Sequence, residues 1–177
     1  MTPKPLLFLA RHATPDWSRT DIRYDIPPGP PLTQQGLAEA RQLGFFLAQA
    51  GVKRLYASPL ERTQRTASIA GEIMGVPVQT VNAIAEWQRG ESTTLVLARM
   101  LPFWEELAAV GIASGPAALV SHGGPIRLLL EKLTGDPAWI STFCRRFDHN
   151  NPLPPAGVWQ ASDNGRGGWA LDLVYVP

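Results

Sequence analysis

The residues best suited to do chemistry are two arginines and two histidines that follow short apolar segments. Arg11 and His12 come directly after the first segment, and Arg62 comes shortly after the second. His122 follows a later segment of the same kind. Imidazole can act as a nucleophile, and the forked donors of guanidinium match the oxygens of a phosphoryl group. These residue types therefore indicate a site for an anionic ligand, and a phosphoryl group fits them best.

The apolar segments alternate with longer segments of helical periodicity, which is typical of βα units around a mainly parallel sheet. We expect strands over residues 6–10, 52–57, 78–81 and 117–121. Helices are expected to begin after Thr33, at Ser58, after Thr93 or Thr94, and at Gly123. The C-terminal third differs, because residues 157–161 and 169–176 flank a turn-rich loop and predict a hairpin.

The helix after the second strand has the clearest start signal. Ser58 is expected to cap it, Pro59 to take its first position, and Glu61 to complete a capping box. The helical pattern continues to Met74, and Gly75 is expected to end it. This arrangement places Arg62 in the first turn of the helix.

The carboxyl ends of parallel strands share one edge of a sheet, where ligands collect beside helix N-termini. Arg11, His12, Arg62 and His122 are therefore expected to line one crevice there. Glu86 follows the third strand and is the acid that can reach the same edge.

Several motifs, taken together, resemble the histidine phosphatase superfamily, also called the phosphoglycerate mutase-like family. They include Leu9-Ala10-Arg11-His12-Ala13 and Tyr56-Ala57-Ser58-Pro59-Leu60-Glu61-Arg62-Thr63, together with Pro31-Leu32-Thr33, Glu86 and Ser121-His122-Gly123-Gly124. The resemblance spans roughly residues 6–134 in the family's order. It implies a three-layer α/β/α sandwich, which we expect to form a single domain over residues 1–177.

The resemblance also implies a role for each matched residue. His12 would be the nucleophile that forms a phosphohistidine, and Glu86 would protonate the leaving alcohol. Arg11, Arg62 and His122 would bind the phosphoryl oxygens, with Gly123 beside them. No metal or cofactor is expected, because these side chains supply the positive charge. Glu86 would need a raised pKa to hold its proton.

Three features depart from the family's pattern. Ala13 stands where the common motif has glycine, and Pro15 and Ser18 replace a frequent pair of polar residues. Ser18 could still donate a hydrogen bond to phosphate, although its side chain is shorter than that of the residue it replaces. Glu91 lies near Glu86, and the spacing favours Glu86 as the proton donor.

The remaining chemically distinctive residues have less support. His149 is expected to be a loop residue, with a place at the pocket rim as the alternative. Trp17 and Trp87 follow catalytic motifs and could form a stacking wall for a substrate ring. Cys144 is expected to be a small packing residue, and as the single cysteine it excludes an intrachain disulfide.

The charge balance of the sequence limits the kinds of partner that the protein can bind. The 177 residues carry 16 basic and 15 acidic side chains, which argues against a surface built to bind nucleic acid or an anionic membrane. The apolar segment over residues 6–10 is shorter than the core of a secretory signal, and no segment approaches a membrane span. We therefore expect a cytoplasmic protein whose partner is a small or protein-borne phosphate ester. The oligomeric state is left open.

We predict a metal-independent phosphomonoester phosphatase. The interval from Glu86 to His122 holds one predicted helix, whereas family members with a substrate-covering insertion carry it there, so we expect an open site. A phosphoglycerate mutase is the enzymatic alternative, and a non-catalytic phosphate-binding regulatory module is the other. An α/β-hydrolase esterase is excluded, because the chain has no Gly-x-Ser-x-Gly motif.

Overall fold

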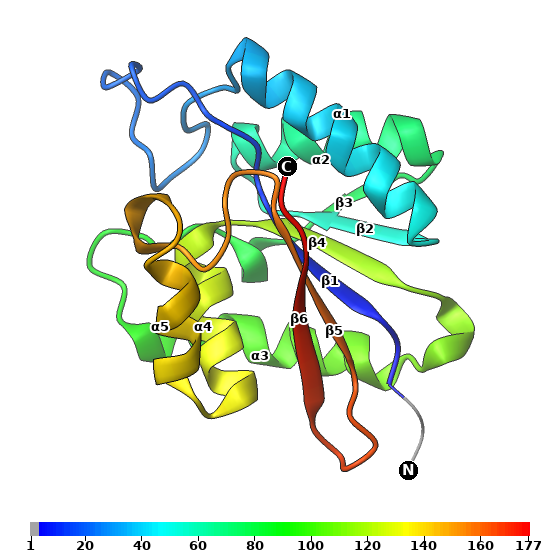
Figure 1. Ribbon diagram of the computed structural model, residues 1–177. Coiled ribbons are helices and arrows are strands. Elements are labelled where there is room, and N and C mark those ends of the chain that lie inside the picture. The colour runs from blue at the N-terminus through cyan, green and yellow to red at the C-terminus, as the bar shows by residue number, and fades with distance from the viewer. Residues whose placement is uncertain (1–3) are drawn as a thin grey trace.

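One six-stranded sheet forms the centre of the molecule (Figure 1). The computed structural model describes residues 4–177. The strands are β1 Leu7–Arg11, β2 Arg54–Ala57, β3 Val78–Thr80, β4 Ala117–Ser121, β5 Val158–Asp163 and β6 Trp169–Tyr175. They lie side by side in the order β3-β2-β4-β1-β5-β6. The two strands that carry the predicted histidines, β1 and β4, are therefore neighbours at the centre of the sheet.

The pairing is parallel from β3 through β2 and β4 to β1, and antiparallel from β1 to β5 and from β5 to β6. Arg11 at the end of β1 pairs in register with Ser121 at the end of β4. His12 and His122 follow these two residues directly, so the register sets them beside each other. The predicted mainly parallel sheet and the C-terminal hairpin are both confirmed.

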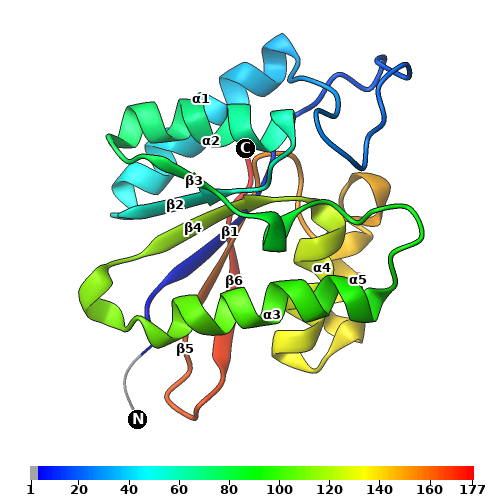
Figure 2. The same ribbon diagram turned by 180° about the vertical axis from the view of Figure 1, so that it is seen from behind.

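Helices cover both faces of the sheet, which confirms the three-layer α/β/α sandwich (Figures 1 and 2). α1 and α2 pack on one face, and α3, α4 and α5 lie on the other. Their bounds are α1 Gln34–Gln49, α2 Glu61–Met74, α3 Thr93–Ala109, α4 Gly123–Thr134 and α5 Pro137–Cys144. Short 3-10 helices span Asn82–Ile84, Ile112–Ser114 and Asp148–Asn150.

Alternate side chains of β1 explain why the sheet needs both helical layers. Leu7 and Leu9 belong to the apolar cluster under α3, α4 and α5, whereas Phe8 and Ala10 belong to the cluster under α1 and α2. All four side chains are buried. Successive side chains of a strand point to opposite faces, so an uninterrupted apolar strand is stable only between two covered faces.

The expected start of α2 is wrong. Ser58 does not cap α2, Pro59 is not its first residue, and Glu61 does not complete a capping box, because the helix begins at Glu61 after Leu60 and has no side-chain cap. The Ser58 hydroxyl instead lies 2.7 Å from Nε2 of His122. α5 was not predicted from the sequence. Gly135 ends α4, and Pro137 then begins this further helix, which Asp136 caps through the backbone N–H of Trp139.

Over residues 4–177, no helix is both long enough and apolar enough to cross a membrane. The buried Cys144 belongs to the apolar cluster beneath α5, which confirms its predicted packing role.

Gly44 tests the close contact between α1 and α2. A Cβ atom at this position would lie 2.9 Å from Cα of Ala70, a backbone atom that cannot move aside alone. We expect Gly44→Ala to lower the free energy of unfolding by about 1–3 kcal/mol, the usual cost of overpacking. Urea unfolding measures this change. Ala48→Ser, at an exposed position of the same helix, is the control and should change stability far less. Equal effects of the two substitutions would contradict the close packing.

Candidate active site

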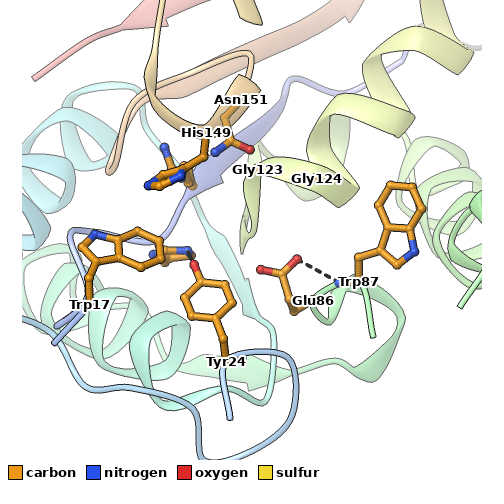
Figure 3. A pocket seen from close by; sticks show the side chains of 10 residues that line it. Trp17, Tyr24, Glu86, Trp87, Gly123, Gly124, His149 and Asn151 are labelled. Carbon is orange, nitrogen blue, oxygen red and sulfur yellow. Dashed lines mark hydrogen bonds between the residues drawn. The ribbon is translucent and has the colours of Figure 1, made fainter. Parts of the chain in front are cut away.

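A cavity of about 380 Å³ opens where β1 and β4 end (Figure 3). Its walls come from the ends of these strands, the start of α4, the loop after β1 and the segments around residues 86 and 149. The lining residues are Arg11, His12, Trp17, Tyr24, Glu86, Trp87, Gly123, Gly124, His149 and Asn151. The crevice expected at the carboxyl edge of the sheet is therefore present.

His12 has a defined tautomer. Its Nδ1 lies 2.8 Å from the carbonyl oxygen of Ala13, and because a carbonyl can only accept, Nδ1 carries the hydrogen. The other nitrogen, Nε2, then holds a lone pair. Burial, with Arg62 and Arg11 nearby, keeps the pKa of His12 well below its usual value. His12 is therefore a neutral imidazole with a nucleophilic Nε2.

His122 has the opposite tautomer. A guanidinium can only donate, and Nη2 of Arg62 lies 3.1 Å from Nδ1 of His122, so Nδ1 accepts. Nε2 then carries the hydrogen and donates it to the Ser58 hydroxyl at 2.7 Å. Burial, and the charge of Arg62, hold the pKa of His122 well below its usual value. The rings of His12 and His122 lie 5.3 Å apart.

Arg62 lies completely buried beneath the pocket. Its Nη2 donates to Oε2 of Glu86 at 3.0 Å, and its Nη1 donates to the carbonyl oxygen of Tyr24 at 2.9 Å. The Tyr24 ring packs over the guanidinium, 3.7 Å from its central carbon. The hydroxyl of the same ring lies 3.2 Å from Nε2 of His12. Burial raises the pKa of Tyr24 to about 12, so this hydroxyl keeps its proton and donates to the histidine.

Glu86 is the acid of the pocket. Its Oε1 accepts from the backbone N–H of Trp87 at 2.8 Å, and its Oε2 lies 3.3 Å from Nδ1 of His122. Burial raises the pKa of Glu86, and the attraction of Arg62 opposes that rise without cancelling it. A carboxyl group with a raised pKa is suited to deliver a proton near neutral pH.

Arg11 is held by an acid of the same wall. Its terminal nitrogens donate to both carboxylate oxygens of Asp148, at 2.7 and 3.0 Å, and one also donates to the carbonyl of Leu153. The Nε atoms of Arg11 and Arg62 are buried and have no hydrogen-bond partner within residues 4–177. Buried donors without a partner are costly. Arg11 lines the pocket, so its side chain is within reach of a ligand that offers acceptor oxygens.

The family model described as "Histidine phosphatase superfamily (branch 1)" matches residues 7–91 and 85–152. The chain belongs to the histidine phosphatase superfamily.

Relatives within this superfamily include both mutases and phosphatases. The chain is 30% identical to a 2,3-bisphosphoglycerate-dependent phosphoglycerate mutase of Bradyrhizobium diazoefficiens, over 73% of this chain and 82% of the relative. It is 27% identical to the uncharacterized phosphatase PhoE of Bacillus subtilis, over 76% of this chain and 80% of the relative. The fold matches that of a mycobacterial glucosyl-3-phosphoglycerate phosphatase with a TM-score of 0.76, at 21% identity and with 98% and 100% of the two chains covered.

The structure brings together most of the residues that the histidine phosphatase resemblance selected. His12, Glu86, Arg11 and Gly123 line the pocket. His122 and Arg62, which were also expected to line it, lie fully buried beneath it and contact Glu86. Ser18 lies outside the lining, and its exposed hydroxyl donates to Asp16 at 2.6 Å. We therefore leave Ser18 out of the phosphate site.

Glu91 also lies outside the pocket. Its carboxylate accepts from Nε of Arg99 at 2.8 Å, and this bond lowers the pKa of Glu91. A carboxylate stabilised in its charged form is a poor proton donor, which supports the preference for Glu86.

Four residues that line the pocket or contact its functional side chains were not assigned a site role from the sequence. Tyr24 and Asp148 contact His12 and Arg11, and Ser58 contacts His122. Asn151 lies against Gly123, where any Cβ would overlap the Asn151 side chain. His149 reaches the rim, the alternative considered for it. Within residues 4–177, no three potential ligands cluster in a way that could hold a metal ion.

The lowered pKa values of the two buried histidines predict how stability changes with pH. Below about pH 6.5 the unfolded chain protonates both histidines, whereas the folded chain keeps them neutral. The free energy of unfolding should therefore fall from pH 7 toward pH 5, by up to about 1.4 kcal/mol per pH unit for each histidine. Glu86 opposes this trend near its raised pKa, because there the folded chain retains a proton that the unfolded chain releases.

Urea unfolding at pH 7, 6 and 5 measures the slope. His122→Gln should reduce the slope, because one group that protonates only on unfolding is lost. Glu86→Gln should make it steeper, because the opposing contribution is lost. An unchanged slope in His122→Gln would show that this histidine is not held neutral.

Proposed function

We propose that the chain is a phosphomonoester phosphatase that acts through a phosphohistidine on His12. The observation that carries this proposal is the hydrogen bond from Nδ1 of His12 to the Ala13 carbonyl, at 2.8 Å. It leaves a lone pair on Nε2, which can attack phosphorus once the Tyr24 hydroxyl that donates to it is displaced, and two buried arginines lie beside it. The membership in the superfamily supports the same chemistry.

The first step would transfer the phosphoryl group to the protein. Nε2 of His12 attacks phosphorus, the N–P bond forms, and the ester P–O bond breaks. Glu86 gives its proton to the departing alkoxide, which leaves as a neutral alcohol. Arg11, Arg62 and His122 stabilise the charge on the phosphoryl oxygens during the transfer. For His122 to donate from Nδ1, its imidazole must take the other tautomer: Nε2 gives up its hydrogen as Nδ1 gains one, and the Ser58 hydroxyl then turns to donate to Nε2.

The second step would release phosphate. Glu86 is now a carboxylate and takes a proton from water as the water oxygen attacks phosphorus. The P–N bond breaks, inorganic phosphate leaves, and both Glu86 and the lone pair of Nε2 return to their starting states. Each proton and bond is accounted for within the pocket and the substrate.

Binding would require an exchange of partners. The Tyr24 hydroxyl contacts Nε2, and Asp148 occupies the terminal nitrogens of Arg11. A phosphate dianion can displace the Tyr24 hydroxyl from Nε2 and offer its oxygens to Arg11, which lines the pocket. The unliganded contacts keep these donors oriented until a substrate arrives.

Phosphoglycerate mutase activity is the second candidate, favoured by curated relatives that carry that name. The segment between Glu86 and His122 argues against it, because this segment holds α3, the short helix Ile112–Ser114 and β4. The pocket stays accessible to water, which favours hydrolysis over return of the phosphoryl group to a second substrate. A small phosphate ester is the expected partner, and a cytoplasmic location remains a prediction from the sequence.

The phosphohistidine itself can be trapped. Brief incubation with a ³²P-labelled phosphate ester and acid-free denaturation should leave label on the wild-type chain. The label should be labile to acid and stable to base, as a phosphoramidate requires, and absent from His12→Ala. Circular dichroism confirms that the variant is folded. Label that survives in His12→Ala would place the nucleophile elsewhere.

The same preparation separates the alternatives. Phosphate release without added acceptor supports the phosphatase. Phosphoglycerate isomerisation primed by a bisphosphate, at a rate above that of release, would establish the mutase instead. Binding of phosphate esters with neither turnover would establish a regulatory module.

Glu86→Gln tests the proton donor. The single-turnover rate of alcohol release from butyl phosphate should fall by about 10²- to 10⁴-fold, the usual contribution of general acid catalysis. The rate for p-nitrophenyl phosphate should fall much less, because nitrophenolate leaves without a proton. Glu72→Gln, at an exposed position of α2, is the control and should match wild type. Equal losses for both esters would remove Glu86 from this role.

A further inference from the structure

The part of the pocket that would receive the leaving group is aromatic. Trp87 lies next to Glu86 in the chain, and its backbone N–H donates to Oε1 of that acid. The indole lies on one side of Glu86, and Trp17 and Tyr24 lie on the other (Figure 3). The group that Glu86 protonates must leave from this space, so its neighbours are tryptophan and tyrosine rings.

The Trp87 indole is held in a fixed orientation. Its Nε1 donates to the carbonyl of Glu91 at 2.6 Å, and the Glu91 carboxylate is fastened in turn to Arg99 by bonds of 2.8 and 3.1 Å. The side chain nevertheless remains 36% exposed. A partly exposed ring that is already fixed loses little conformational freedom when a ligand stacks on it.

Gly124 keeps the space between the acid and the indole open. A Cβ atom there would lie 3.6 Å from the Trp87 ring and 3.9 Å from Oε1 of Glu86. A side chain at this position would therefore occupy the volume that contacts both groups. With glycine, a ligand atom can reach the proton donor and the ring face together.

The charge of the pocket argues against a second anionic group on the substrate. Among the lining residues of the described chain, Arg11 is the one arginine or lysine, and Asp148 already pairs with it. Arg62 lies fully buried below and is shared by Glu86, His122 and Tyr24. After the phosphoryl group has taken these donors, the lining left for a carboxylate on the leaving group is Glu86, the rings of Trp17, Tyr24 and Trp87, and the side chains of His149 and Asn151, with no further arginine or lysine among the described residues.

We propose that the substrate is the phosphate ester of an uncharged alcohol that carries a ring, and that this ring stacks on Trp87. This inference rests on the proposed phosphatase function and adds its substrate class. An aromatic ring and a sugar ring share the chemistry that a tryptophan face recognises. Trp17, stacked on Tyr24 with ring centroids 5.1 Å apart, forms the opposite wall.

Three esters of alkyl alcohols provide the test, because their leaving groups need protonation to a similar degree. We expect kcat/KM for benzyl phosphate to exceed that for butyl phosphate by about threefold to tenfold, the contribution expected of one aromatic pair. 3-Phosphoglycerate should be poorer than both. Trp87→Leu should bring the ratio of benzyl to butyl phosphate close to one, and Gly124→Ala should lower it by filling the space beside the ring.

Trp139→Leu is the matched control. Trp139 is also 36% exposed, but it lies on α5 and packs against Phe143 and Trp159, away from the pocket lining. In Trp139→Leu, the ratio of kcat/KM for benzyl phosphate to kcat/KM for butyl phosphate should equal the wild-type ratio. Glucose 6-phosphate distinguishes a sugar ring from an aromatic ring. If its kcat/KM exceeds that of butyl phosphate and Trp87→Leu abolishes this difference, the recognised ring is a sugar.

Equal kcat/KM for benzyl and butyl phosphate, an unchanged ratio in Trp87→Leu, or a preference for 3-phosphoglycerate would overturn the inference. Calorimetric measurement of binding tests ring recognition independently of catalysis, so failure of this inference can be distinguished from failure of the phosphatase proposal. Phenethylphosphonate should bind more tightly than pentylphosphonate even if no ester is hydrolysed. Equal affinities, or binding of neither compound, would overturn the inference, whereas absence of hydrolysis alone would overturn the phosphatase.

Discussion

Arg11 and Arg62 are buried near the carboxyl ends of β1 and β4, and the segments around them must supply partners for their charge. Arg62 has no exposed surface and Arg11 has 1%. A guanidinium removed from water is costly unless its donors are paired. Glu86 and Asp148 supply the opposite charges, and the Tyr24 and Leu153 carbonyls supply neutral acceptors. Segments far apart in the sequence are thus drawn to one point of the fold.

The topology of the sheet brings these distant segments together. β1 and β4 are sequentially distant but adjacent and parallel, so both end at the same edge. The backbone N–H of His12 donates to the carbonyl of Ser121, which continues the ladder one residue past the strand. This backbone hydrogen bond places His12 beside the end of β4, and side-chain contacts to Ser58 and Arg62 hold His122 next to it. A rigid backbone of this kind can hold a nucleophile without flexible loops to support it.

A feature of the fold or of the site could be predicted when the residues that determine it lie close together in the sequence. The uninterrupted apolar run of β1 and the Gly75 that ends α2 are local signals, and the sequence sufficed to predict them. Ser58 was misassigned because its local pattern is that of a capping residue, and its actual partner, His122, is remote. Tyr24 and Asp148 lie in irregular segments without periodicity, so nothing near them in the sequence indicates that they meet His12 and Arg11.

The pocket is stabilised without substrate by groups that imitate one. The Asp148 carboxylate binds Arg11 through two oxygens, as a phosphate would, and the Tyr24 hydroxyl donates to the nucleophilic nitrogen. These stand-ins leave the buried Nε of each arginine without a partner. A planar carboxylate has only two oxygens, whereas a tetrahedral phosphoryl group offers three acceptors in addition to the ester oxygen. Under the proposed function, a phosphoryl group could therefore offer Arg11, which lines the pocket, more acceptors than the Asp148 carboxylate does.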